Sequence, residues 1–189
     1  PDQITIQAGT PNGDQRNVEV AFLSDSLIEG EETATVSITS SSTIASNTFQ
    51  DSHRLKIQDQ NIPIIRFTTT DTTIKEGAPK QSIGVQLDLG NSQLKVPLAF
   101  QLIPGQNDTA VGNFPANNNQ AHDFQLSPID LNYQAGSPNN TVVQVQVTAL
   151  NDQLVEGNET ANLSVTISSS GFPQFTSPAV HPVQIQDAN

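Results

Sequence analysis

Five carboxylates between residues 76 and 187 have the types and spacing of a shared metal site. They come from four connecting segments separated by apolar stretches: Glu76, Asp123, Asp152, Glu156 and Asp187. Like charges held close together repel, which raises carboxylate pKa values and costs stability unless a cation offsets the repulsion. Calcium takes about six to eight oxygen ligands and suits loop carboxylates, whereas zinc prefers His or Cys. The acids therefore favour calcium, provided that the fold brings the four segments together.

A partial copy of this acid set occurs earlier, because the sequence repeats. Residues 25–34 match residues 152–161 at an offset of 127, and residues 53–59 match residues 181–187 at an offset of 128. A period this long indicates tandem domains rather than a solenoid. We place a complete second copy at residues 62–189 and the C-terminal half of a first copy at residues 1–61. The first copy offers a weaker, partial site at Asp25, Glu29 and Asp59.

Alternating apolar residues show which elements must position these acids. Residues 34–38, 143–149 and 183–185 are apolar at every second position, which is typical of half-buried strands. No helical stripe accompanies them, so we expect an all-β protein. The second copy is predicted to form a β-sandwich of seven strands, at residues 64–69 (continuing to 74), 81–89, 96–103, 129–133, 141–150, 160–168 and 180–186. The first copy is predicted to form the last four, at residues 4–7, 17–23, 33–39 and 54–58.

If successive strands run antiparallel, all five acids of the second copy fall at the same end of the sandwich. Glu76 follows the first strand, Asp123 closes a long polar loop, and Asp187 ends the last strand. The alternative is that these acids are simply hydrated on the surface. Glu32 and Glu159 each stand at the start of a strand. Instead of binding an ion, they can accept hydrogen bonds from backbone amides of the preceding loop.

The motifs that carry the acids resemble a known family. Asp-x-x-x-Glu-Gly-x-Glu stands at residues 25–32 and 152–159, and each copy closes with Ile-x-Asp, at residues 57–59 and 185–187. The pattern resembles the Calx-β domain, the calcium-binding module of sodium–calcium exchangers, which also occurs in integrin β4 and bacterial surface proteins. The resemblance implies an immunoglobulin-like antiparallel sandwich with Ca2+ at the acidic end. The strongest calcium binders of that family carry paired Asp where this chain has Asn151-Asp152. We therefore expect at most one weakly held ion in the second copy.

Composition excludes several other functions. The net charge is −12 with seven Lys and Arg residues, which supplies no basic patch for nucleic acid or anionic lipid. No apolar run is long enough to insert directly into a membrane. The chain has no Cys, and it lacks nucleophile-elbow, phosphate-loop and His-Glu-x-x-His motifs, so we expect no enzyme. His53 and His181 are equivalent residues of the two copies, just before the last strand, for which a packing or edge role is expected rather than catalysis.

Two functions remain open at this stage. The first is a calcium-stiffened structural or adhesive repeat of a larger cell-surface or secreted protein, whose partners are neighbouring repeats. The second is a regulatory calcium sensor of a membrane transporter or exchanger. The first copy is expected to lack its cover, which leaves seven apolar side chains facing water: Val18, Val20, Phe22, Val36, Ile38, Leu55 and Ile57. Strands preceding Pro1 in a longer array, another chain, or the second copy folded back would cover them. The short linker at residues 59–63 disfavours the last, so we expect a truncated array whose exposed face is covered by self-association.

Overall fold

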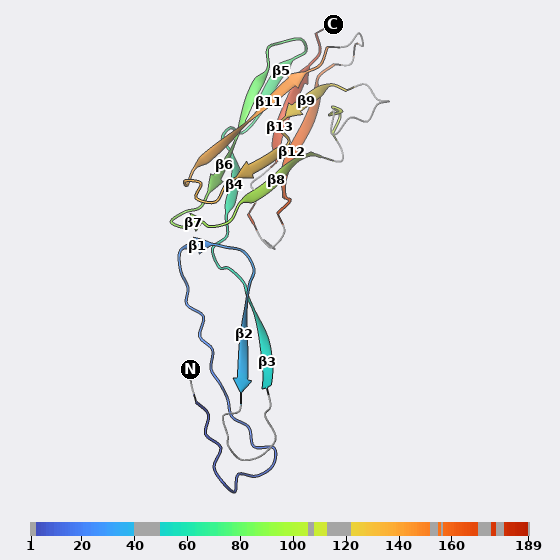
Figure 1. The fold of residues 1–189 in the computed structure, drawn as a ribbon. Coiled ribbons are helices and arrows are strands. Elements are labelled where there is room, and N and C mark those ends of the chain that lie inside the picture. The colour runs from blue at the N-terminus through green and yellow to red at the C-terminus, as the bar shows by residue number, and fades with distance from the viewer. Residues whose placement is uncertain are drawn as a thin grey trace.

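The computed structural model describes residues 3–39, 50–105, 108–112, 122–151, 155, 157–169, 175–176 and 180–188. All the regular structure in these residues is strand, which confirms the predicted all-β class. Figure 1 shows a sandwich formed by the second copy, from which the hairpin of the first copy extends. Within the part of the chain that is described, no helix has the length and apolar character needed to cross a membrane.

The second copy is a sandwich of a five-stranded and a four-stranded sheet. The first sheet has the order β10 (Asp130–Tyr133), β8 (Leu98–Pro104), β12 (Glu159–Ile167), β13 (His181–Gln186) and β5 (Thr72–Lys75). The second has the order β4 (Ile64–Phe67), β6 (Gln81–Asp88), β11 (Thr141–Ala149) and β9 (Phe124–Ser127). The predicted first strand is therefore divided between the two sheets. β4 pairs antiparallel with β6, whereas β5 pairs parallel with β13.

The inward residues of the two sheets form one apolar core. Along β11 the burial alternates, so that Val145 and Val147 are buried while Gln144 is exposed. This is the period-two pattern of the sequence expressed as packing. The buried ring of Tyr133 packs edge-on against Phe100, and its hydroxyl donates a hydrogen bond of 2.8 Å to the carbonyl of Val85. That bond connects the two sheets through the centre of the core.

His181 has a packing role, as its place in the internal repeat predicted. It is 1% exposed, and its ring packs against Phe67. Its Nδ1 lies 3.1 Å from the carbonyl oxygen of Thr69, which can only accept, so Nδ1 carries the proton. Its Nε2 therefore accepts from the Thr72 hydroxyl, 2.9 Å away. Its counterpart in the first copy, His53, is exposed.

Stability is expected to fall on the acid side of pH 6.5 because of His181. Burial lowers the pKa of His181 below its ordinary value of 6.5, although the Thr69 carbonyl and Asp71 act in the opposite direction. The unfolded chain therefore binds a proton that the folded chain resists, and stability falls as the pH drops from 6.5 through the folded-state pKa. Urea unfolding between pH 7.5 and 5 measures this loss. His181→Gln should flatten the profile over that interval.

The first copy contributes a hairpin, β2 (Glu32–Thr39) paired antiparallel with β3 (Gln50–Ile57), and a short strand, β1 (Leu27–Ile28). The predicted strands at residues 4–7 and 17–23 are wrong, because the structure has no strand there. Their equivalents in the second copy, β10 and β11, bond to β8, β6 and β9. Residues 1–61 contain no equivalents of these three partners, so the two segments form no ladder.

Six apolar side chains of the first copy are exposed at positions whose equivalents form the core of the second copy. We call them the apolar face: Ile4, Ile6, Val18, Val20, Phe22 and Ile38, each of which is at least 42% exposed. The side chains 127 positions later are all buried: Leu131, Tyr133, Val145, Val147, Ala149 and Val165. The prediction that seven side chains face water is thus confirmed for Val18, Val20, Phe22 and Ile38. The other three, Val36, Leu55 and Ile57, are partly buried.

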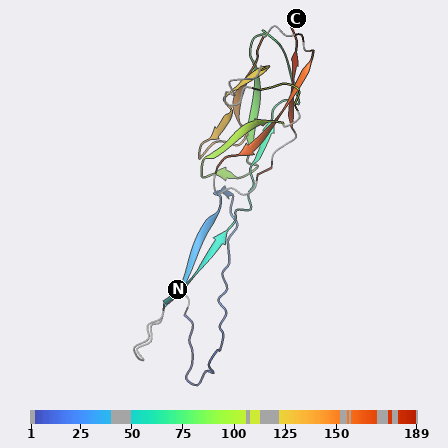
Figure 2. The ribbon, with the colours of Figure 1, turned by 90° about the vertical axis from the view of Figure 1, so that its right-hand side faces the viewer.

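A parallel pair of short strands joins the two copies, and we call it the junction. β1 of the first copy pairs with β7 (Gln93–Leu94) of the second. The amide of Gln93 donates to the Ser26 carbonyl at 2.8 Å, and the amide of Lys95 donates to the Ile28 carbonyl at 3.0 Å. Ile28 is fully buried and belongs to the core cluster of the second copy. Figures 1 and 2 show this pair between the hairpin and the sandwich.

Candidate metal-binding pole

The structure places Glu76, Asp123 and Asp187 at the same end of the second copy, which we call the acidic pole. The amide of Glu76 donates to the Gln186 carbonyl at 3.0 Å, so the end of β5 lies beside the end of β13. The amide of Leu150 donates to the Asp123 carbonyl at 2.8 Å, which brings the start of β9 beside the end of β11. The Asn151 side chain lies close to Gly77 and connects these two pairs of segments.

Two of these carboxylates are buried. Glu76 is 9% exposed and Asp123 is 6% exposed. The Asp123 carboxylate accepts a short hydrogen bond from the amide of Val111, and Glu76 Oε2 accepts a long one, at 3.4 Å, from the amide of Ala188. Among the described residues, which include every Lys and Arg of the chain, neither carboxylate is in an ion pair. Backbone donors are therefore the neutralising groups that we observe around these two buried acids.

Asp187 holds the neighbouring loop in place. Its Oδ2 accepts a hydrogen bond of 3.3 Å from the amide of Gly157, which has a positive φ of 86°. Only Gly adopts this left-handed conformation at little cost, which gives Glu156-Gly157 in the sequence motif a physical reason. Asp152 and Glu156 themselves lie outside the described residues.

The available donors fit a hard cation in chemistry but do not form a complete site. Carboxylate and carbonyl oxygens are the ligands that calcium prefers, and three segments present them at this pole. Within the described ranges, no three Asp, Glu or His side chains are grouped closely enough to hold a metal ion. Glu76, Asp123 and Asp187 would therefore need Asp152 and Glu156, as the sequence proposes, and the role of all five as ligands stays a prediction.

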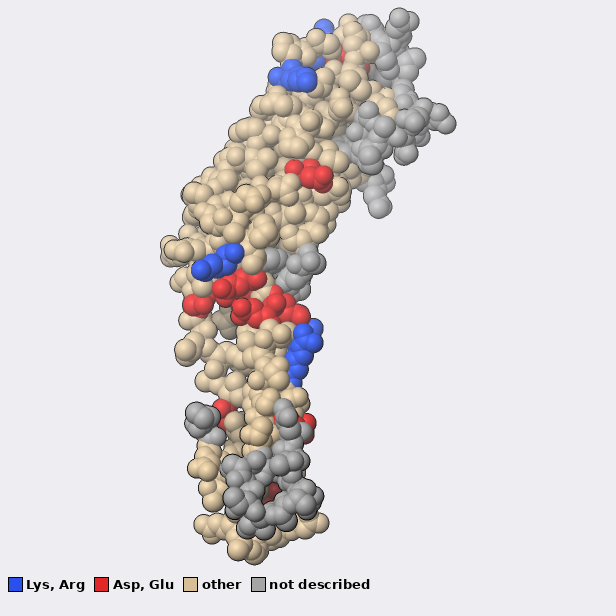
Figure 3. Space-filling model, in the orientation of Figure 1, with Lys and Arg blue, Asp and Glu red and all other residues tan. Residues whose placement is uncertain are grey.

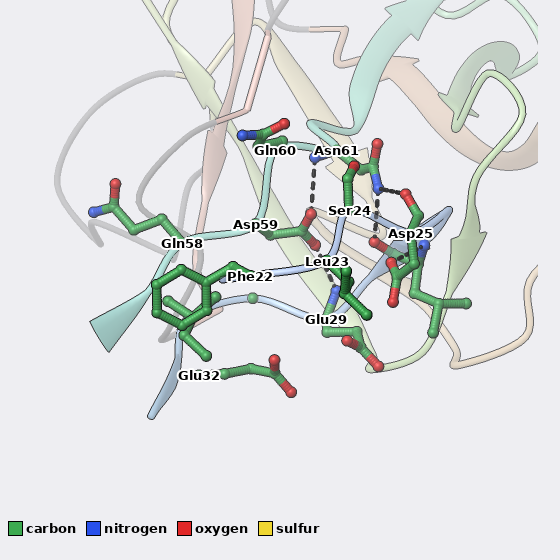
Figure 4. A pocket seen from close by; sticks show the side chains of 13 residues that line it. Phe22, Leu23, Ser24, Asp25, Glu29, Glu32, Gln58, Asp59, Gln60 and Asn61 are labelled. Carbon is green, nitrogen blue, oxygen red and sulfur yellow. Dashed lines mark hydrogen bonds between the residues drawn. The ribbon is translucent and has the colours of Figure 1, made fainter. Parts of the chain in front are cut away.

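The acids of the first copy line a pocket of about 140 Å³ beside the junction (Figure 4). Asp59 accepts 2.8 Å hydrogen bonds from the amides of Glu29 and Asn61, through Oδ2 and Oδ1 respectively. Asp25 Oδ1 accepts from the amide of Leu27 at 2.9 Å. Asp25 and Asp59 thus organise the loop by binding its backbone. With Glu29 they do not form a metal-holding group of three, so this weaker site also stays a prediction.

Glu29 has the least favourable electrostatic surroundings in this pocket. Its partial burial and the nearby Glu32 and Asp25 raise the pKa of Glu29 above 4.5, while Lys95 acts in the opposite direction. Lys95 belongs to the second copy, so a cation of one repeat faces the acids of the other. Figure 3 shows acidic side chains gathered where the hairpin meets the sandwich, with basic side chains on either side. Lys56 and Glu31 form a 3.0 Å ion pair across the hairpin.

The sequence interpretation missed the residues that build the junction. Neither β1 nor β7 was predicted, because two-residue strands leave no periodic signal. The side chain of Asn61 also went unnoticed. Its Nδ2 donates to the carbonyls of Asp25 and Leu27, at 2.9 and 3.1 Å, and connects the linker to the loop (Figure 4). A signal was available, because both copies end in Asn, at Asn61 and Asn189.

The family model of the Calx-beta domain matches residues 9–61 and again residues 58–189. The two matches cover most of the chain, and the chain therefore belongs to the Calx-beta family. They also fit the tandem copies inferred from the internal repeat. Calx-beta domains are non-catalytic calcium-binding modules.

Several solved structures are similar to the chain. The apo form of a Calx CBD1 domain is 15% identical with a TM-score of 0.43, and the match covers 68% of this chain and 99% of that one. CBD12 from CALX1.2 is 16% identical with a TM-score of 0.44, covering 67% and 44%. The PapD-like domain 7 of human CEP192 is 12% identical with a TM-score of 0.44, covering 66% and 85%. No curated protein sequence matches the chain.

Proposed function

We propose that this protein is a non-enzymatic, calcium-binding structural or adhesive module of a larger cell-surface or secreted protein. In this proposal, Ca2+ at the acidic pole stiffens the loops there and the contact with a neighbouring repeat. The observation that supports it is the burial of Glu76 and Asp123 at one pole without a Lys or Arg partner. A buried carboxylate needs a compensating charge or hydrogen bonds, and a hard cation would supply the charge.

The acids would act by cross-linking loops that are far apart in the sequence. Glu76 follows β5, Asp123 precedes β9 and Asp187 follows β13, so an ion held by them would connect both sheets. The ion would also offset the repulsion among the acids, which otherwise opposes folding. Because the unfolded chain does not assemble the ligands, binding would stabilise the folded state alone.

Calcium is expected to raise the free energy of unfolding by about 2.7 kcal/mol at a concentration of 100 times its dissociation constant. Asp152→Ala, which removes a predicted ligand, should abolish this gain, and Glu76→Gln should reduce it. Thermal unfolding in calcium and in chelator, with calorimetric titration of calcium, measures the effect. The chain has one Tyr and no Trp, so Tyr fluorescence reports the second copy alone.

Asp88→Asn provides a matched control. Asp88 ends β6, beside the junction and away from the acidic pole, and it pairs with Arg66 at 3.1 Å. Its loss should lower stability equally with and without calcium. Coincident melting curves of the unmodified chain at millimolar calcium would contradict the calcium proposal. A dissociation constant of about 10⁻⁴–10⁻³ M supports an extracellular structural module, whereas about 10⁻⁷–10⁻⁵ M would favour the alternative, a regulatory sensor of a transporter.

A further inference from the structure

The hairpin of the first copy has two free edges, whereas its counterpart in the second copy has none. Within the described residues, β2 and β3 pair only with each other. Their equivalents, β12 and β13, lie inside the five-stranded sheet, where β12 also pairs antiparallel with β8 and β13 also pairs parallel with β5. Figures 1 and 2 show the hairpin projecting away from the sheets of the second copy. The outer edges of β2 and β3 are therefore open to strand addition.

The edge of β2 is the better acceptor of the two. After Glu32, residues 33–39 carry no charge, whereas β3 contains an Asp, a His, an Arg and a Lys. Charged side chains on an edge strand discourage the addition of another strand. β2 also contributes Ile38 to the apolar face, and the equivalent of Ile38, Val165, is buried and pairs in register with Leu102 of β8. A strand added to β2 would thus lie beside the apolar face.

One continuous segment covers the equivalent face in the second copy. Residues 62–105 contain β4 to β8, of which β8 pairs with β10 and β12, and β6 pairs with β11. The segment contributes these fully or almost fully buried side chains: Ile65, Ile83, Val85, Leu87, Leu98, Phe100 and Leu102. They form one core cluster with the equivalents of the apolar face. The internal repeat thus shows what kind of segment fits this face.

Charge favours the same kind of segment. Residues 62–105 contain four Lys and Arg and three Asp and Glu, a net charge of +1. Residues 106–189, which complete the second copy, contain seven Asp and Glu and no Lys or Arg, a net charge of −7. The first copy, residues 1–61, contains three Lys and Arg and nine Asp and Glu, a net charge of −6. Two acidic first copies repel each other, whereas a segment charged like residues 62–105 complements either acidic half.

We propose that the first copy is an acceptor for the N-terminal half of another Calx-beta repeat, a segment of the type of residues 62–105. A strand like β8 would add antiparallel to the free edge of β2, in the register that β8 has on β12. Its inward side chains, with those of a strand like β6, would cover the apolar face. Residues 4–7 and 17–23 would then have the strand partners that β10 and β11 have in the second copy. The proposal involves neither the acidic pole nor calcium.

Thiol accessibility tests this proposal, because the chain has no Cys of its own. The reporter is Val20→Cys, since Val20 is 46% exposed and its equivalent, Val147, is fully buried. It is made in the 189-residue chain and in an extended chain in which residues 62–127 directly precede Pro1. The new boundary repeats the natural Ser127-Pro128 bond, so the added segment has its own connection to the acceptor.

The thiol of the Val20→Cys variant is expected to react with a maleimide at least about tenfold more slowly in the extended chain. Labelling is done at a dilution at which light scattering shows the 189-residue chain to be a monomer, so that a second copy does not cover the face. Tyr133 is absent from the added segment, and its fluorescence therefore reports whether the second copy is folded in every variant.

Two further variants separate docking from other effects of the longer chain. Asn17→Cys should react equally fast in both chains, because Asn17 and its equivalent, Gln144, are both exposed. Leu102→Asp in the added segment alone should restore fast labelling of the Val20→Cys thiol, since it places a charge where β8 contributes a buried side chain.

Hydrogen exchange gives a second measurement that needs no substitution. A strand added to β2 would bind the amides on its free edge, so those amides within residues 33–39 should exchange at least about tenfold more slowly in the extended chain. Equal labelling and exchange rates in the two dilute chains would overturn the proposal. Self-association that the added segment does not reduce would also overturn it, in favour of a second copy of the chain as the occupant.

Discussion

Ile28→Ala is expected to lower the free energy of unfolding of the second copy by about 2–5 kcal/mol, although residue 28 belongs to the first copy. Ile28 is 0% exposed and packs in the core cluster around Leu94. Truncation of a buried Ile removes its transfer free energy and leaves a cavity. Urea unfolding followed by the fluorescence of Tyr133, the one Tyr of the chain, measures this loss directly.

Val155→Ala is the matched control, because it makes a comparable truncation at the equivalent position of the other copy. With its side chain 80% exposed, Val155 should contribute less than about 0.5 kcal/mol to the 189-residue chain. Equal losses for the two variants would show that Ile28 does not stabilise the second copy. In that case the two copies would be independent modules joined only by the linker at residues 59–63.

Val147→Asp is expected to cost several kcal/mol and to unfold most of the second copy. Val147 is fully buried on β11, and an unpaired carboxylate there would lose its hydration without gaining a partner. Typical domains are stable by only about 5–15 kcal/mol, so one such charge removes a large part of the total. Circular dichroism and Tyr fluorescence at 25 °C report the loss of folded protein.

The equivalent substitution in the first copy should not destabilise the second copy. Val20 stands 127 positions before Val147 and is 46% exposed. Val20→Asp should leave the unfolding of the second copy unchanged. It should also weaken the self-association that we expect from the apolar face, as light scattering can measure. If Val20→Asp unfolds the second copy as Val147→Asp does, the apolar face is covered in solution by the chain itself.

The sequence determined most strands of the second copy and the order of the acids among them, although it predicted neither β7 nor β9. The alternation in residues 143–149 is a local property, because each strand must turn one face to the core, and it predicted β11 to within one residue. The order of the strands then placed Glu76, Asp123 and Asp187 at one end. No strand pairing had to be known for that, since each antiparallel strand reverses the direction of the chain. The motif and its repeat were sufficient to indicate the family.

Only the tertiary structure decided which apolar residues are buried. Ile4 and Leu131 have the same place in the repeat, yet the first is exposed and the second is buried, because burial depends on the strands opposite. The contact between β1 and β7 could not be predicted from the sequence either. Its two hydrogen bonds join short segments that are far apart in the chain, and neither segment is long enough to show a periodic pattern. Hydrophobic patterning is a local property of each segment. Which strands cover an apolar face depends on the tertiary structure, and Ile28 is buried because residues of the second copy cover it.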